Sequence, residues 1–264
     1  MTKRAHKKAR RAARPASARP ERQQDPRLAA TPATAIGDEP LSPGTWVVLV
    51  EPVNMDDGRE LQWHPPQPVA FSLVEAKKLC DRAVPARRRI VGNLVRRDNG
   101  TYMPTNSHRT LDVLSDLWSA VLHSFAAVEA IANDSIDRLP KDAVVTIGKK
   151  DRTRDVPQED MVRTLNLEEK FGLAVPMLDV GEPIKGRGPW ERYLHLKGIR
   201  DDLVHVKDRG VDPDRAVRTA YDRLLLGDAD TCAKDALDVV QAARPGLLGC
   251  HVVEYLVPPS AGSQ

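Results

Sequence analysis

One apolar stripe at helical spacing, from Leu111 to Leu139, most constrains how this chain can fold. Its members recur every three or four residues, as they do on one face of a helix. The pattern predicts a single helix that begins near Ser107 and stops at Pro140, because proline cannot continue a helix. A helix of about 30 residues can serve as the spine of a helical bundle. The stripe consists of Leu111, Leu114, Trp118, Val121, Leu122, Phe125, Val128, Ala132, Ile136 and Leu139.

Shorter helices are predicted after this spine, so the fold class is mainly α. Asn166 and Glu169 favour an N-terminal cap before NLEEKFGLAV, and an Asp-Pro pair opens DPDRAVRTAYDRLLLG. The polar segment 141–156 is expected to be a loop, and CHVVEYLV in the C-terminal segment 246–264 indicates a closing strand. These patterns predict an up-and-down bundle over residues 105–245. Its shorter helices cover residues 166–175, 190–206, 212–227 and 228–243.

A small α+β unit is predicted for residues 44–104. TWVVLV is rich in β-branched residues and indicates a strand. SLVE, residues 72–75, is a capping box for a helix that ends near Val84. Asn99-Gly100 is a turn signal typical of a β-hairpin.

The N-terminal segment is strongly basic. Residues 1–27 hold ten Lys or Arg and two acids, Glu21 and Asp25, for a net charge of +8. The whole chain is +3, so residues 28–264 carry the difference, −5. Low apolar content and repeated prolines predict a disordered basic tail over residues 1–43. Such a tail either binds RNA or another polyanion, or only aids solubility.

Composition excludes several classes of protein. With 41% hydrophobic and 29% charged residues, the chain has the balance of a soluble globular protein. No apolar run approaches about 18 residues and no secretory signal begins the chain, so we expect a cytoplasmic protein without a membrane span. Its three cysteines lack the spacing of a zinc site or a disulfide scaffold, so we expect no metal and no cofactor.

The helix that contains GIRDDLVHVKDRG has two apolar sides and must pack against two surfaces. One side is the predicted core face. The other is expected to meet a partner subunit, the small α+β unit or a cleft, and we predict that it forms a two-fold homodimer. The core face is Leu196, Ile199, Leu203 and Val206, and the second side is Trp190, Tyr193, Leu194 and Val204.

Polar residues within the long helix are also unusual. Glu129 falls inside the apolar arc, where an acid is costly unless it is paired, and Asn133 lies at the edge of the same arc. Pairing with Arg200 or Lys170 would satisfy Glu129. The alternative is a solvated position at the end of the bundle.

The bundle, over residues 105–245, resembles the HEPN superfamily of small helical proteins. The resemblance rests on FAAVEAIANDSI in the long helix, on EEKF, and on IRDDLVH near a helix end. The family's motif is an arginine, usually followed by a polar residue, and then a histidine after four to six intervening residues. Here Arg200 precedes Asp201, and four residues separate Arg200 from His205. Only this pair lies on a predicted amphipathic helix, whereas the bare pattern also fits Arg59 with His64 and Arg244 with His251.

The resemblance implies metal-independent RNA cleavage by a dimer whose two motifs line one basic cleft. His205 would take the proton of a ribose 2′-hydroxyl, and Arg200 would neutralise the phosphorane, leaving 2′,3′-cyclic phosphate ends. Asp201, four residues before the histidine, would fix the imidazole tautomer. A toxin or phage-defence effector of this kind would have a neutralising partner protein. The expected RNA contacts are Lys197, Lys207 and Arg209.

Two other interpretations remain open. The first is a HEPN-like bundle without catalysis that serves RNA or nucleotide binding or protein assembly. In the second, Arg200, Asp201 and His205 form a salt-bridged helix end in an interaction module. The negative charge of residues 28–264 counts against a broad nucleic-acid surface.

Overall fold

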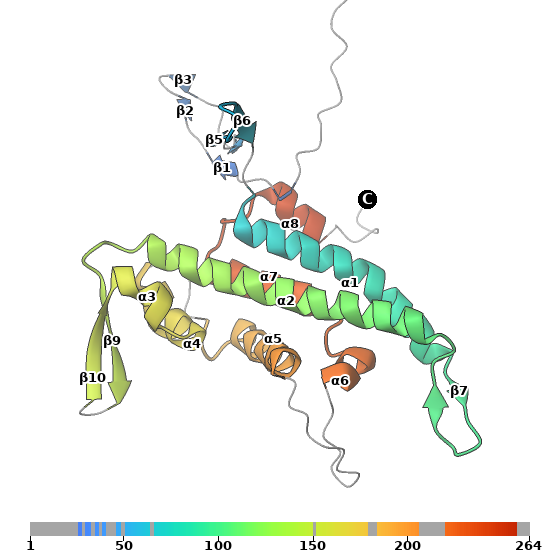
Figure 1. The fold of residues 1–264 in the computed structure, drawn as a ribbon. Helices are drawn as coiled ribbons and strands as arrows, with labels where there is room; N and C mark the ends of the chain where they lie inside the picture. Colours follow the sequence, from blue (N-terminus) through green and yellow to red (C-terminus); the bar gives the residue numbers. More distant parts are fainter. Residues whose placement is uncertain are drawn as a thin grey trace, which may run out of the picture.

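The computed structural model of the chain describes residues 26–27, 30–32, 35–36, 39–40, 46–48, 51–63, 66–149, 152–178, 184–205 and 220–257. Within these ranges the protein is mainly helical, as the sequence predicts. The helices gather around one long member, α2 (Figure 1).

The central helix α2 spans Ser107–Asp137, which is 31 residues. It begins at Asn106, whose side chain accepts a hydrogen bond from the backbone N–H of Arg109 at 2.9 Å. It ends before Pro140, so the predicted helix is confirmed, although Leu111 and Leu122 of the predicted stripe are exposed. By length and composition α2 could cross a membrane, since one window has a mean hydropathy of 1.2. Half of that window is buried inside the bundle, and a bundle's core helix passes the same test.

Helix α1, Pro68–Gly92, runs along α2 and shares its core (Figure 1). It begins before the predicted capping box, because Gln67 is the N-cap and its side chain accepts a hydrogen bond from the N–H of Ala70. It also continues past Val84 through Pro85, which is exposed. Proline has no backbone N–H, so one hydrogen bond of the helix is missing at this position. The helix that was expected in a small α+β unit therefore packs in the main core.

Further helices surround α2. Helix α7 contacts α1, α2 and α5, while α8 lies against α1. The predicted closing strand is wrong, since CHVVEYLV forms α8. Val252 and Leu256, four residues apart, are both buried, which is a helical spacing. The helices are α5 (Gly188–Val204), α6 (Ala220–Leu226), α7 (Cys232–Ala243) and α8 (Cys250–Leu256).

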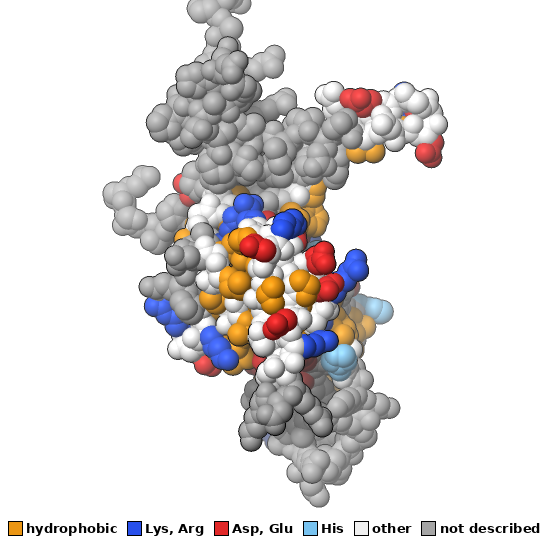
Figure 2. Space-filling view, turned by 90° about the vertical axis from the view of Figure 1, so that its left-hand side faces the viewer, with side chains coloured by type: hydrophobic (Ala, Val, Ile, Leu, Met, Phe, Trp, Pro, Cys, Tyr) orange, Lys and Arg blue, Asp and Glu red, His pale blue; other side chains and the backbone are white. Residues whose placement is uncertain are grey.

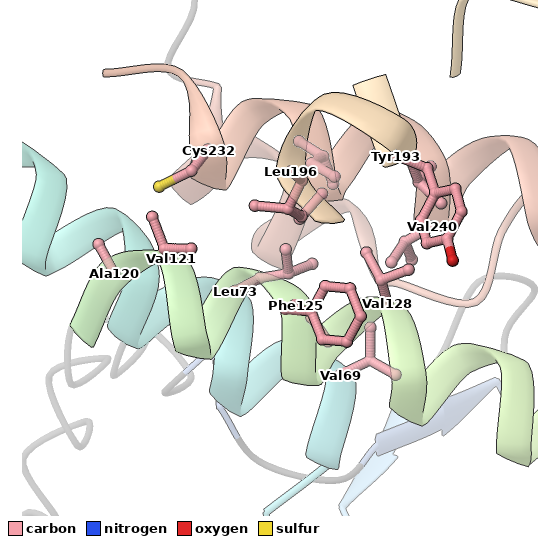
Figure 3. Close-up of a cluster of buried hydrophobic side chains, with 14 of the residues drawn as sticks. Val69, Leu73, Ala120, Val121, Phe125, Val128, Tyr193, Leu196, Cys232 and Val240 are labelled. Carbon is pink, nitrogen blue, oxygen red and sulfur yellow. The ribbon is translucent and has the colours of Figure 1, made fainter. Parts of the chain in front are cut away.

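Apolar side chains from four helices meet in one core (Figure 3). Each fully buried leucine or phenylalanine stabilises the fold by about 1.5–3 kcal/mol relative to leaving it exposed. This burial fixes α5 against α2 and α7, and so positions the polar residues of α5. The core includes Val69 and Leu73 of α1, Val121, Phe125 and Val128 of α2, Tyr193 and Leu196 of α5, and Val240 of α7.

The predicted loop after α2 is instead a β-hairpin. Strands β9 (Val144–Lys149) and β10 (Arg152–Pro157) pair antiparallel, with Val145 opposite Val156. Both valines are buried in a second core cluster with Met161. Charged residues in the segment hid this alternation of apolar and polar positions.

A second hairpin precedes α2, at the opposite end of that helix (Figure 1). Strands β7 (Val95–Arg96) and β8 (Tyr102–Met103) pair through the turn predicted at Asn99-Gly100. Gly100 has a φ of 81°, which only glycine adopts without cost. This hairpin prediction is confirmed.

The N-terminal part contains short strand pairs. Residues 46–48 form β4, which confirms the strand predicted for TWVVLV. The predicted disordered tail is interrupted by strands at residues 30–32, 35–36 and 39–40, and residues 1–25 lie outside the described ranges. The pairs are β1 (Ala30–Pro32) with β4 (Trp46–Val48), β2 (Ala35–Ile36) with β3 (Glu39–Pro40), and β5 (Glu51–Asn54) with β6 (Glu60–Trp63).

A chain of short helical turns connects the β9–β10 hairpin to the segment before α5. The predicted capping box is confirmed: Asn166 and Glu169 each accept a hydrogen bond from the other's backbone N–H at 2.9 Å. The helical segment predicted to stop before Pro176 continues past it, and this proline lies in a 3₁₀ turn. The turns are α3 (Gln158–Thr164), α4 (Leu167–Glu169), the π-helical turn η1 (Lys170–Ala174) and the 3₁₀ turn η2 (Val175–Leu178).

Candidate site at the end of helix α5

Helix α5 ends at the predicted motif. Its core face is confirmed at Leu196, Ile199 and Leu203, which are buried, while Val206 lies outside the described residues. The helix stops after Val204, and the backbone N–H of His205 closes the last turn on the carbonyl of Asp201 at 2.9 Å.

Arg200 is held by two contacts. Its guanidinium carbon lies 4.8 Å from the centre of the Phe125 ring of α2, a cation–π arrangement that stabilises by about 1 kcal/mol. Its Nη1 donates to Oδ1 of Asp201 at 2.8 Å. The side chain remains 32% exposed. The guanidinium of Arg200 is therefore held in one orientation and remains accessible to a ligand from solvent.

Asp201 does not contact the histidine side chain in the predicted way. Its carboxylate accepts from Arg200 and lies 3.2 Å from Nζ of Lys197, which in turn lies 3.6 Å from Glu168. Partial burial favours a higher pKa for Asp201, but the bonds from Arg200 and Lys197 outweigh it and hold the pKa below the usual value. The bond to Asp201 also raises the pKa of Lys197. Asp201 is thus an anion that orients two cations.

The neighbouring acid has a separate structural role. Asp202 accepts a hydrogen bond from Nη1 of Arg223 at 2.6 Å, and Nε of the same arginine donates to Asp228 at 3.0 Å. Arg223 belongs to α6, so this pair connects the end of α5 to the next described helix. The two consecutive aspartates therefore neutralise different arginines.

His205 is exposed at the first position after α5. His205 forms a hydrogen bond with another described residue only through its backbone N–H. The imidazole is therefore available to a ligand from solvent. The other two predicted RNA contacts, Lys207 and Arg209, lie outside the described residues.

The three predicted supporting residues lie together, in an arrangement that differs from the prediction. Lys170 is buried, and its Nζ donates to Oδ1 of Asn133 at 2.8 Å. Burial lowers the pKa of Lys170, and the negative charge of Glu129 opposes this shift. Glu129 itself is exposed, which agrees with the solvated alternative and not with an acid inside the core. Asn133 rather than Glu129 supplies the hydrogen bond to the buried ammonium.

The predicted second apolar side of α5 is not a free surface as a whole. Trp190 and Tyr193 are buried, with ring centres 4.9 Å apart, and the Tyr193 ring lies 5.8 Å from that of Phe171. Phe171 of the π-helical turn η1 packs on Tyr193, which a helical wheel cannot reveal. Only Leu194 and Val204 of the predicted dimer face are exposed.

Tyr193 carries a buried hydroxyl that forms no hydrogen bond among the described residues. Burial raises the pKa of Tyr193 far above its usual value, and the nearby charges of Glu168 and Asp201 act in the same direction. An unpaired buried hydroxyl costs about 1–3 kcal/mol.

We therefore expect Tyr193→Phe to raise the free energy of unfolding by about 1 kcal/mol, measured by urea denaturation. The ring contacts with Trp190 and Phe171 are retained in this variant, so packing is unchanged. Tyr193→Leu is the matched control, which should destabilise because it removes the ring. A destabilised Tyr193→Phe would mean that the hydroxyl has a partner.

Two cavities lined only by described residues lie elsewhere. One of about 330 Å³ is apolar, and one of about 190 Å³ includes Arg89 and Arg109. Neither is lined by Arg200, Asp201 or His205. Figure 2, which faces the end with α3 and the β9–β10 hairpin, shows basic and acidic side chains interspersed around apolar ones. The described part of this face has no continuous basic surface.

Phe125 and Glu168 are the site residues that sequence reasoning missed. Phe125 was assigned to the core stripe, and its second role as the platform under Arg200 has no local sequence signal. Comparison of the chain with protein families, curated proteins and solved structures finds no match.

Proposed function

We propose that this protein is a HEPN-like endoribonuclease that cuts RNA without a metal ion, with Arg200 and His205 as its reacting groups. The observation that supports the proposal is the end of α5, where a fixed, partly exposed guanidinium and an exposed imidazole lie five residues apart. Both groups can reach a substrate in solvent, and Arg200 is already oriented before the substrate binds.

The proposed reaction uses the RNA's own nucleophile. His205 removes the proton of a 2′-hydroxyl, and that oxygen attacks the adjacent phosphorus. The bond to the 5′-oxygen then breaks, leaving a 2′,3′-cyclic phosphate and a free 5′-hydroxyl. Arg200 stabilises the extra negative charge on phosphorus. One N–H of its guanidinium bonds to Asp201, and a guanidinium has five N–H donors in all, so donors remain for the phosphate.

A second candidate is a HEPN-like module without catalysis. The observation that favours it is the balance of charge at the site. Asp201 neutralises Arg200 and, with Glu168, also neutralises Lys197. A site whose cations are already paired attracts RNA weakly over a distance. Binding without cleavage would support this candidate.

The proposal includes a two-fold dimer, as the family resemblance implies. The exposed Leu194 and Val204 are on the same helix as the motif and would lie in the contact. We also propose a role as a toxin or phage-defence effector that is held inactive by a partner protein. Light scattering at tens of micromolar, roughly the scale that reveals a specific interface, tests the dimer.

The direct test of the proposed function is cleavage of a mixed RNA pool by the full chain. Activity should persist in EDTA, and the products should carry 2′,3′-cyclic phosphates. An RNA with one 2′-deoxy residue at the cut site should resist. Cleavage that disappears with chelation and leaves 5′-phosphates would overturn the proposal.

The basic tail offers a separate prediction. Residues 1–25 contain nine Lys or Arg and two acids, a net charge of +7. Removing them spares Arg27, which donates to Glu75 of α1 at 3.1 Å. We expect unfolding free energy to change by less than about 1 kcal/mol. RNA affinity should fall and depend less on salt, because fewer counterions are released. Equal affinity and salt dependence after deletion would remove the tail from RNA binding.

A further inference from the structure

Two cysteines that are far apart in the sequence meet inside the bundle. Sγ of Cys80 on α1 lies 3.5 Å from Sγ of Cys232, the first residue of α7, and 152 positions separate them. Both side chains are buried and reduced. Figure 3 shows Cys232 pointing into the core, beside Ala120 and Val121 of α2.

We propose that Cys80 and Cys232 are a thiol–disulfide site, at which a low-molecular-weight disulfide oxidises the pair to a bond between α1 and α7. A disulfide requires about 2.05 Å between the sulfurs. From 3.5 Å, each sulfur must move by roughly 0.7 Å to reach that distance. Helix packing has already placed the two sulfurs side by side.

The two thiols have different parts in the reaction. The hydrogen bond with Cys232 lowers the pKa of Cys80, whereas the same bond, together with burial, raises the pKa of Cys232. Cys80 therefore ionises first, and its thiolate attacks one sulfur of the reagent disulfide. That S–S bond breaks and releases one small thiolate, leaving a mixed disulfide on Cys80.

The second step closes the bond. Cys232 gives its proton to the released thiolate, and its sulfur attacks the Cys80 sulfur of the mixed disulfide. A second small thiolate leaves and is protonated by solvent. Overall the protein loses two hydrogens and two electrons, and the reagent disulfide is reduced to two thiols.

The position of the disulfide would allow it to stabilise the fold. Asp230, two residues before Cys232, is paired with Arg87 of α1, so the disulfide would add a covalent link to an existing ion pair. The closed loop contains all of α2, the β7–β8 and β9–β10 hairpins, α5 and α6. A long loop restricts the unfolded chain strongly, so oxidation should raise thermal stability. This property does not depend on the proposed ribonuclease activity.

The experiment uses the full chain with Cys250→Ser, which leaves only the pair. The chain is refolded from guanidinium chloride in oxidised and reduced glutathione, so that burial cannot block the reagent. The bonded fraction is measured by mass spectrometry after acid quenching, and is compared with the same mixture kept in denaturant. We expect the effective concentration of the two thiols to be roughly 100-fold higher in the folded chain. The melting temperature should rise by about 5–10 °C.

Two controls make the result specific. Cys80→Ser and Cys232→Ser, each with Cys250→Ser, should form only mixed disulfides and show no rise in melting temperature. Circular dichroism confirms that each variant is folded. An effective concentration that is equal or lower in the folded chain, or a bonded form that melts no higher than the reduced one, would overturn the proposal.

Discussion

Replacing His205 with alanine is expected to slow RNA cleavage strongly while the bundle stays folded. The imidazole is exposed and forms no side-chain bond with described residues, so its removal leaves the core intact. Loss of a positioned base lowers the rate by about 10²–10⁴. Arg200→Ala should lower it by about 10²–10³, because the phosphorane loses its charged donor. Cleavage rates and circular dichroism spectra of the purified variants check both expectations.

The other Arg–His pairs of the sequence supply matched controls. Arg59→Ala and His251→Ala should cut RNA at the normal rate. Arg59 donates to Asp57 in an exposed turn, far from the motif in sequence. A catalytic Arg200 should also be sensitive to its orientation, so Phe125→Leu should slow cleavage while RNA binding persists. Full activity in both His205→Ala and Arg200→Ala would place the reaction in another part of the chain.

The largest expected effect on stability is at Asp230. This carboxylate accepts two hydrogen bonds from Arg87, at 2.6 and 3.0 Å, and both side chains are largely buried. Arg87 also donates to the carbonyl of Leu225 at 3.0 Å. Asp230→Ala leaves the arginine charge buried without its partner, so we expect a loss of about 3 kcal/mol in the free energy of unfolding. Urea denaturation measures this directly.

Two further variants separate a buried pair from an exposed one. Asp81→Ala removes the exposed partner of Lys77 on the same helix α1, and should cost no more than about 0.5 kcal/mol. Arg87→Met combined with Asp230→Leu removes both charges, and should be more stable than Asp230→Ala alone. A cost at Asp230 similar to that at Asp81 would show that solvent screens the Arg87 pair.

The successful predictions depend on residues close together in the sequence. The stripe of α2, the Asn166–Glu169 box and the Asn99-Gly100 turn each involve spacings of four residues or fewer. Their local geometry is therefore fixed before any tertiary contact forms.

The missed features depend on what covers a surface. Periodicity shows that one side of α5 is apolar, but it cannot show that Phe171 buries Tyr193 there. Likewise, Arg200 and Phe125 are brought together only when α5 packs on α2. The segment CHVVEYLV has residues that favour a strand, and contact with α1 makes it helical. Tertiary packing determines these three features, so local sequence patterns do not predict them.

The pairing of α1 with α2 also has a consequence for how the chain folds. The two helices are consecutive and are joined only by the short β7–β8 hairpin, so their contact closes a small loop at little entropic cost. Roughly a hundred residues separate α2 from α7, so the contacts of α7 with these two helices form more slowly. We therefore expect the α1–α2 hairpin to form early and to act as the template on which α5 and α7 assemble. A destabilising mutation at the contact between α1 and α2 would then slow refolding, whereas one in α7 would mainly speed up unfolding.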